Sequence, residues 1–233
     1  MRWSVEGYTF PILKILLEEG EEVIAEAGAM MLMKGVEVET IQIDSEDSPW
    51  YKAATEAIAR KLFTGETIFH NKFRGPGELW LTSSLPGQIE YVKLVDDEWI
   101  IQDYSYLAHH GDIKIDLAWK GKRGIALGDL IWLKVKGEGG VWVSAYGELK
   151  WLEVKEGEEV IIDNMHFVAI PENIDWEVTK LNMKTFALGG EGYAIKVRGP
   201  AKVLLQTRIL PPLAKALARF MPSKWLSLAE RFL

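Results

Sequence analysis

One pattern occurs three times in the chain: Arg74-Gly75-Pro76-Gly77-Glu78-Leu79-Trp80-Leu81, Lys136-Gly137-Glu138-Gly139-Gly140-Val141-Trp142-Val143 and Arg198-Gly199-Pro200-Ala201-Lys202-Val203-Leu204-Leu205. The first glycines of these stretches are separated by equal intervals of 62 residues (137 − 75 and 199 − 137). A period of this size indicates copies of one supersecondary unit. A glycine turn that leads into a short run of aliphatic and aromatic residues is typical of a strand. The sequence therefore predicts an all-β body built from three pseudo-symmetric repeats.

The third copy of the repeat is divided between the two ends of the chain. The first two copies cover residues 65–116 and 128–178, and the third begins at residues 190–208. Its missing half resembles residues 10–40, where Glu19-Gly20-Glu21-Glu22-Val23-Ile24 matches Glu156-Gly157-Glu158-Glu159-Val160-Ile161. An open solenoid needs capping repeats and gains nothing from a divided copy. We therefore expect a closed ring of three repeats, in which the two ends of the chain pair side by side.

The alternation of side chains along the three strands predicts which residues form the core. Leu79 and Leu81, Val141 and Val143, and Val203 and Leu205 lie at alternate positions and are expected to face inward. Trp80 and Trp142 lie between them and are expected to face away from the core. Such rings could form a platform for a sugar or another ligand, but packing between repeats or subunits is the favoured interpretation.

Helices are predicted at one insertion and at the C-terminal end. Residues 48–63 begin with Ser-Pro and continue with helical spacing of apolar residues. The body is expected to span residues 1–210 and an amphipathic tail residues 211–233. The tail carries four Lys or Arg against one Glu, and its two short helices need a surface to pack on. That surface is either the protein's own β body, a neighbouring subunit or a membrane. The candidate interface residues are Trp80, Trp142, Leu217, Phe220, Trp225 and Phe232.

The composition limits the classes of function. The 233 residues include no cysteine, which excludes disulfides and thiolate metal sites and fits a cytoplasmic location. The net charge of −7 makes a nucleic acid an unfavourable partner. Glu and Lys are frequent while Asn and Gln occur four times each, which suggests a thermophilic source. No secretory signal and no apolar run long enough to span a bilayer is present, and we expect no cofactor.

The four histidines are the strongest candidates for chemistry. The pair His109-His110 could suggest metal ligands, but neighbours on a strand point to opposite faces, so we expect solvent-exposed loop residues. His166 is expected to be a structural residue within a strand. No nucleophile elbow, phosphate-binding loop or dinucleotide fingerprint is present. The sequence therefore predicts that the protein is not an enzyme and holds no metal.

Several motifs, in order, resemble the mitochondrial biogenesis family named for altered inheritance of mitochondria. They are Ala25-Glu26-Ala27-Gly28-Ala29-Met30, Arg74-Gly75-Pro76-Gly77, Asp163-Asn164 followed by His166, Gly189-Gly190-Glu191-Gly192, and Arg198-Gly199-Pro200 ending in Leu205-Gln206-Thr207-Arg208. The resemblance covers residues 5–208 and implies a β-sandwich or double-stranded β-helix like the tryptophan RNA-binding attenuation protein. It also implies a homotrimer, with no assigned reaction or ligand.

Two classes of function follow from these observations. The first is a non-enzymatic oligomeric scaffold or binding protein, with the tail as a contact to a membrane or a protein partner. The second is a ligand- or RNA-binding regulator, which rests on analogy of fold alone. The acidic body favours the first class.

Overall fold

The computed structural model describes residues 1–42, 69–117, 132–180 and 193–220, and these residues form an all-β structure with one C-terminal α-helix. The predicted helix at residues 48–63 and the tail residues Trp225 and Phe232 lie outside the described residues. The strands are β1 (Arg2–Glu6), β2 (Ile12–Leu17), β3 (Glu22–Glu26), β4 (Met30–Lys34), β5 (Glu37–Gln42), β6 (Phe69–Arg74), β7 (Gly77–Leu81), β8 (Ile89–Gln102), β9 (Tyr106–Leu117), β10 (Trp132–Ser144), β11 (Leu149–Val154), β12 (Glu159–Asp163), β13 (Phe167–Pro171), β14 (Asp175–Lys180), β15 (Tyr193–Arg198) and β16 (Ala201–Gln206).

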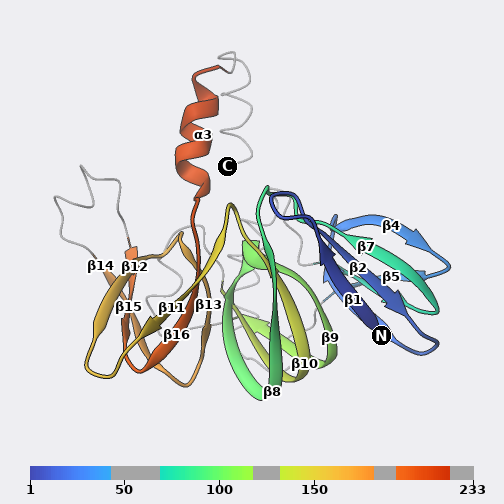
Figure 1. Cartoon of the computed structure of the whole chain (residues 1–233), viewed down its shortest axis with the longest axis horizontal. Helices are drawn as coiled ribbons and strands as arrows, with labels where there is room; N and C mark the ends of the chain where they lie inside the picture. The colour runs from blue at the N-terminus through green and yellow to red at the C-terminus, as the bar shows by residue number, and fades with distance from the viewer. Residues whose placement is uncertain (43–68, 118–131, 181–192, 221–233) are drawn as a thin grey trace.

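The strands form three antiparallel sheets, and they gather into three groups that lie in a row across the molecule (Figure 1). A sheet of nine strands runs through the whole row in the order β11-β16-β13-β8-β10-β9-β3-β6-β5. A sheet of four strands, β1-β2-β7-β4, lies at the N-terminal end, and one of three strands, β12-β15-β14, lies at the C-terminal end. The nine-stranded sheet therefore joins the parts of the molecule into one hydrogen-bonded structure.

The strands fall into three groups that pair in the same order. In the N-terminal unit (β2–β7), β7 pairs with β2 and β4 while β6 pairs with β3 and β5. In the C-terminal unit (β11–β16), β16 pairs with β11 and β13 while β15 pairs with β12 and β14. In the middle unit (β8–β10), each long strand takes the place of two short ones, and β10 pairs along its length with β8 and β9. The quoted glycine stretches lie at the same point of each unit: the β6–β7 turn, the β10 bulge at Gly137/Glu138 and the β15–β16 turn.

The prediction of a divided third repeat is wrong. Residues 10–40 pair with β6, β7 and β9 rather than with residues 190–208. Residues 190–208 pair instead with the strands that directly precede them, β11 to β14. A period in the sequence does not show which strands share hydrogen bonds, so it could not place the boundaries of the units. The expected closed ring is not found either, because β4 of the N-terminal unit and β12 of the C-terminal unit lie at opposite ends of the molecule and do not pair (Figure 1). A threefold relation between the units stays a prediction.

The turns that suggested the divided copy do occupy matching environments. The amide of Gly75 donates to the carbonyl oxygen of Glu21, and the amide of Gly199 donates to that of Glu158, both at 2.9 Å. These two tight turns belong to the N-terminal and C-terminal units, each complete within its own stretch of chain. The similarity between the two sequences therefore reports a repeated turn rather than two halves of one unit.

The predicted inward faces are confirmed for five of the six residues. Leu79, Leu81, Val141, Val143 and Val203 are buried. Leu205 is half-buried, and its neighbour Leu204 is fully buried instead. The strand end of β10 is buried on both faces, since Trp142 and Ser144 are also inaccessible.

The helix α3 (Leu210–Ala218) follows β16 and carries Pro211 and Pro212 in its first turn, where a missing amide costs nothing. It projects away from the sheets in Figure 1, and none of its residues is buried. The helix therefore does not dock on the β body within the described residues. No helix in this part of the chain is long and apolar enough to cross a membrane.

Candidate functional site

Three of the four histidines meet at the contact between the N-terminal and middle units. His70 lies on β6, while His109 and His110 lie on β9 rather than in the exposed loop that the sequence predicted. His70 and His109 are buried and His110 is half-buried. The prediction of solvent exposure failed because β3 pairs with β9 at Ala108 and His109 and covers this strand.

Tyr106 fixes the inner histidines. Its hydroxyl donates to the carbonyl oxygen of Ile24 at 3.2 Å and lies 2.6 Å from Nδ1 of His109. Its ring packs edge-on against the His70 ring, with centroids 5.1 Å apart. Burial, together with the nearby imidazoles of His70 and His110, lowers the pKa of His109 from 6.5 to about 3. His109 is therefore neutral at physiological pH and serves as a hydrogen-bonded core residue.

A hollow of about 230 Å³ opens beside this cluster, lined by Gly20, Glu22, Ile24, His109, His110 and Gly111. The carboxylate of Glu22 is bound by the guanidinium of Arg74, which contributes most to the lowered pKa of that carboxyl. His110 is bound in turn to the Tyr91 hydroxyl, 2.9 Å from its Nε2. Within the described residues, no group of three histidines or carboxylates could hold a metal ion. The hollow therefore brings together polar groups that already have partners.

His166 was expected within a strand but lies in the turn between β12 and β13. Its Nδ1 lies 2.7 Å from the carbonyl oxygen of Gln206, and its backbone amide donates to Asp163. The side chain ties this turn to the end of β16, so the prediction of a structural role agrees with its contacts.

Trp142 does not face outward, and in this respect the sequence prediction was wrong. The side chain is fully buried and belongs to the core of the N-terminal unit. Trp3 of β1 packs edge-on against it at 5.7 Å, and the rings of Tyr91 and His110 lie 5.4 Å and 5.2 Å away. Strand β1 is the edge strand beside β2, and its Trp3 ring covers Trp142 and Tyr91 of the middle unit. Trp142 is therefore unavailable to a partner in this structure.

Trp80 is half-buried on the outward face of β7. Its indole donates to Glu78 at 2.7 Å, and the ammonium of Lys14 lies 4.2 Å from the centre of its ring. The tail residues Leu217 and Phe220 are strongly exposed, at 53% and 87%. Three of the predicted interface residues, Trp80, Leu217 and Phe220, are thus accessible to some degree.

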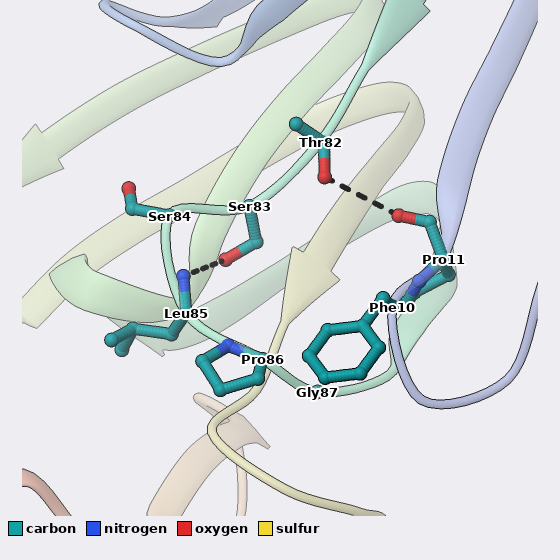
Figure 2. Close-up of a pocket in the computed structure, with 8 residues that line it drawn as sticks. All are labelled: Phe10, Pro11, Thr82, Ser83, Ser84, Leu85, Pro86 and Gly87. Carbon is teal, nitrogen blue, oxygen red and sulfur yellow. Dashed lines mark hydrogen bonds between the residues drawn. The ribbon is translucent and has the colours of Figure 1, made fainter.

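A second hollow, of about 220 Å³, lies between the β1–β2 loop and the connection from β7 to β8 (Figure 2). The hydroxyl of Thr82 donates to the carbonyl oxygen of Pro11 at 3.4 Å, and Ser83 accepts from the amide of Leu85 at 3.2 Å. The ring of Phe10 stands beside Pro86 and is largely exposed. The sequence analysis missed this place because its residues lie in loops without a chemical motif. Thr82 joins the two loops, and Ser83 stabilises the turn of its own loop.

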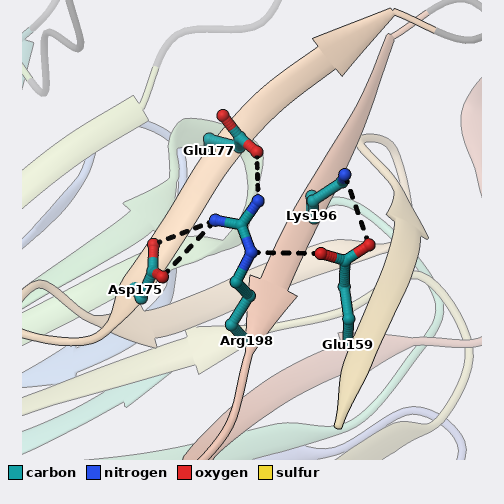
Figure 3. Close-up of polar contacts among 5 residues, drawn as sticks. All are labelled: Glu159, Asp175, Glu177, Lys196 and Arg198. Carbon is teal, nitrogen blue, oxygen red and sulfur yellow. Dashed lines mark hydrogen bonds and ion pairs between the residues drawn. The ribbon is translucent and has the colours of Figure 1, made fainter. Parts of the chain in front are cut away.

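The same ion-pair arrangement occurs on all three units. In each unit, one glutamate forms ion pairs with two cations on the neighbouring strand of the sheet. The sets are Glu22 with Lys72 and Arg74, Glu98 with Lys134 and Lys136, and Glu159 with Lys196 and Arg198. Figure 3 shows the C-terminal set, in which the guanidinium of Arg198 also binds Asp175 and Glu177. Hydrogen bonds from these cations lower the pKa of each glutamate, and because the pairs are exposed, water screens them and each adds little to stability. They are cross-strand supports and not acid–base pairs.

The largest exposed apolar strand is β4, whose sequence is Met30-Met31-Leu32-Met33-Lys34. All five residues are exposed, and β4 pairs with β7 on one side alone among the described strands. The equivalent strand β13 has four of five residues buried. An exposed edge of this composition is a template for pairing with another strand. It is the feature of the described surface that most clearly lacks a partner within the chain.

The model of the mitochondrial biogenesis AIM24 family matches residues 3–208, from β1 to the residues that follow β16. The chain belongs to this family. The AIM24 match confirms the resemblance read from the sequence motifs, and α3 lies beyond it.

Two relatives of this AIM24 chain come from Streptococcus pyogenes. An uncharacterized protein of serotype M6 is 27% identical over 231 residues, covering 96% of this chain and 92% of its own length. A crystal structure of a Streptococcus pyogenes protein has a TM-score of 0.74 and 25% identity, covering 94% of this chain and 99% of the other. These comparisons give the AIM24 chain a family and a fold, and their names assign no activity that could be transferred.

Proposed function

We propose that this AIM24-family protein is a non-enzymatic scaffold or binding protein that works as a homo-oligomer. The observation that supports this most strongly is the apolar strand β4, which is exposed while its counterparts, the first half of β9 (residues 106–109) and β13, are buried by neighbouring strands. An exposed methionine-rich edge is a liability for a monomer, and burying it against another copy removes the liability.

The chemistry of the described residues supports a role without catalysis. His109 is neutral and bound to Tyr106, and His110 is bound to Tyr91. The carboxylates near the hollow are paired as well, with Glu22 bound to Arg74 and Glu21 bound to the N-terminal ammonium. The amide of Glu18 and that ammonium lower the pKa of Glu21, so it is held as a carboxylate. A general acid or base needs a free group near its working pH, and these side chains do not provide one.

The mass of the native protein tests this proposal. We expect light scattering at micromolar concentration to give a multiple of the 26.4 kDa chain mass, with the family resemblance favouring three copies. Burial of the β4 residues supplies the driving force, at about 25 cal/mol per Å² of apolar surface. A mass of a single chain over the whole concentration range would contradict the proposal.

The exposed helix α3 supports a second element of the function, contact with a membrane surface. Leu217 and Phe220 form an exposed apolar face, and Lys215 and Arg219 lie beside it. Short helices of this kind are stabilised by an interface that buries the apolar face and binds the cations.

Deletion of residues 211–233 should leave the melting temperature within about 2 °C, because α3 buries no residue against the sheets. It should also abolish sedimentation with vesicles that contain anionic lipid. The matched control is the full chain with Leu217→Ser and Phe220→Ser, which should lose binding while keeping its charge. Undiminished binding by the truncated chain would exclude the tail as the membrane contact.

A further inference from the structure

The units of the chain are joined by one kind of junction, which occurs twice. Between the middle and C-terminal units, β8 pairs with β13 through Ile101↔Ala169 and Ile100↔Ile170. Between the N-terminal and middle units, β3 pairs with β9 through Ala25↔Ala108 and Ile24↔His109. Numbered by the six short strands of a terminal unit, β3 and the second half of β8 are second strands, and the first half of β9 and β13 are third strands. In both junctions the second strand of one unit therefore pairs antiparallel with the third strand of the next unit.

The registers within the units show that these residues are equivalent. Glu22, Glu98 and Glu159 occupy the same position, each opposite the last cation of its ion-pair set. Counting from that position, Ile161 corresponds to Ile24 and Ile100, and Ile162 corresponds to Ala25 and Ile101. The third strands are aligned through their partners: Trp80, Trp142 and Leu204 hold the same repeat position, and each pairs with a residue of β4, β9 or β13. By that alignment, the position of Leu32 corresponds to Ala108 and Ala169, and that of Met33 to His109 and Ile170.

Two junction strands are left over at the ends of the row. Among the described strands, β4 pairs with β7 alone and β12 pairs with β15 alone, so each has an open edge. Their side chains are exposed where their equivalents are not: Met33 is 41% exposed and Ile170 0%, while Ile161 is 56% exposed and Ile100 2%. The residues nevertheless stay apolar, as they would for a buried position.

The open edges of β5, β14 and the second half of β9 differ from these two in kind. Strands β5 and β14 each have one partner, and the second half of β9 likewise pairs with β10 alone. These edges are open in every unit, so their exposure is a regular feature of the fold. The edges of β4 and β12, in contrast, are open, while the equivalent edges in the other two units are covered by a neighbouring strand.

We propose that β4 of one copy pairs with β12 of a second copy, in the register of the internal junctions. Leu32 then lies opposite Ile162, and Met33 opposite Ile161. This inference rests on the proposed homo-oligomer and specifies its contact. It also predicts one hydrogen bond beyond the ladder: the amide of Glu172 donates to the carbonyl oxygen of Glu98 at 2.9 Å, and Gly35 stands at the equivalent position to donate to Glu159.

The contact is between copies because the two strands lie at opposite ends of the molecule, as Figure 1 shows. It is head-to-tail because β4 meets a different strand and not its own copy. Such a heterologous contact repeats from copy to copy and ends when the assembly closes into a ring.

Cysteine pairs test this contact, because the natural chain has no cysteine and introduced thiols are unambiguous. Met33→Cys and Ile161→Cys are made in separate chains, mixed and oxidised. Directly opposed residues of an antiparallel pair have Cβ atoms about 4.5–5.5 Å apart, close enough for cross-linking. We expect a covalent dimer from the mixture and none from either variant alone. The matched control replaces Met33→Cys by Val38→Cys on the regular open edge β5, and it should give no dimer with Ile161→Cys.

Each other outcome has a definite meaning. A Met33→Cys dimer formed without the second variant shows symmetric β4–β4 pairing and overturns the proposal. An internal disulfide in a monomeric double variant shows that the chain closes on itself, which overturns this contact and the homo-oligomer together. An oligomer by light scattering that lacks the mixed cross-link leaves the proposed scaffold in place and refutes the β4–β12 contact. As a second variant at an already exposed position, Ile161→Lys should reduce the mass to one chain without unfolding it, and an unchanged mass overturns the proposal.

Discussion

Replacing Trp142 by alanine should lower the free energy of unfolding by about 3–5 kcal/mol, the range for removing a large buried aromatic side chain. Trp142 is fully buried, and the rings of Trp3, Tyr91 and His110 pack around it. The substitution leaves a cavity between β1 and the middle unit, and these rings are too constrained by their strands to fill it. Denaturant unfolding followed by circular dichroism measures the effect.

Trp80→Ala is the matched control, since Trp80 lies at the same position of its repeat. It is half-buried, and the substitution removes a hydrogen bond to Glu78 and the contact with Lys14. We expect a loss of about 1 kcal/mol for this surface change. Equal losses for the two tryptophans would mean that Trp142 is not the buried anchor described above.

Gly199→Ala should have the second largest effect, a loss of about 3 kcal/mol in the free energy of unfolding. A Cβ at this position would overlap the backbone carbonyl oxygen of Lys155, which cannot move without breaking the turn between β11 and β12. The amide of Gly199 also donates to Glu158, so a shift of the turn would disturb this hydrogen bond.

Gly157→Ala, in the opposing turn, separates steric overlap from backbone strain. Gly157 has a φ of +78° and no atom within 4 Å of an added Cβ, so its cost is the left-handed conformation alone. That cost is about 1–2 kcal/mol. A cost at Gly157 as large as that at Gly199 would show that backbone conformation, and not the close approach of the two turns, accounts for the repeated glycine.

The fold class could be predicted from the sequence because strand alternation is a local property. Leu79 and Leu81 follow a glycine turn and alternate with polar or aromatic neighbours, and both are buried as expected. The division of the repeats could not be predicted, since it depends on which strands share hydrogen bonds. The similarity of residues 10–40 to the segment after β11 is the same whether these residues complete the last unit or begin the first. The similarity therefore does not assign them to a unit.

The environment of the histidines could not be predicted for a related reason. His109-His110-Gly111-Asp112 has the composition of a turn, yet it lies within a strand that β3 covers from a distant part of the sequence. The burial of Trp142 likewise depends on Trp3, and the first residues of the chain carry no pattern that would place β1 over the middle unit. The exposure of β4 could not be predicted either, because the run Met30-Met31-Leu32-Met33 does not alternate and is typical of a strand covered on both faces.

The connections between the units are short: residues 82–88 join β7 to β8, and residues 145–148 join β10 to β11. A short tether holds two surfaces at an effective concentration in the millimolar range. The two junctions inside the chain are therefore formed at any dilution, even if each contact is weak by itself. A contact of the same kind between separate chains has no tether, and its occupancy follows the amount of protein present. In the proposed assembly, two of the junctions are therefore permanent, while the β4–β12 contact depends on the concentration of the protein.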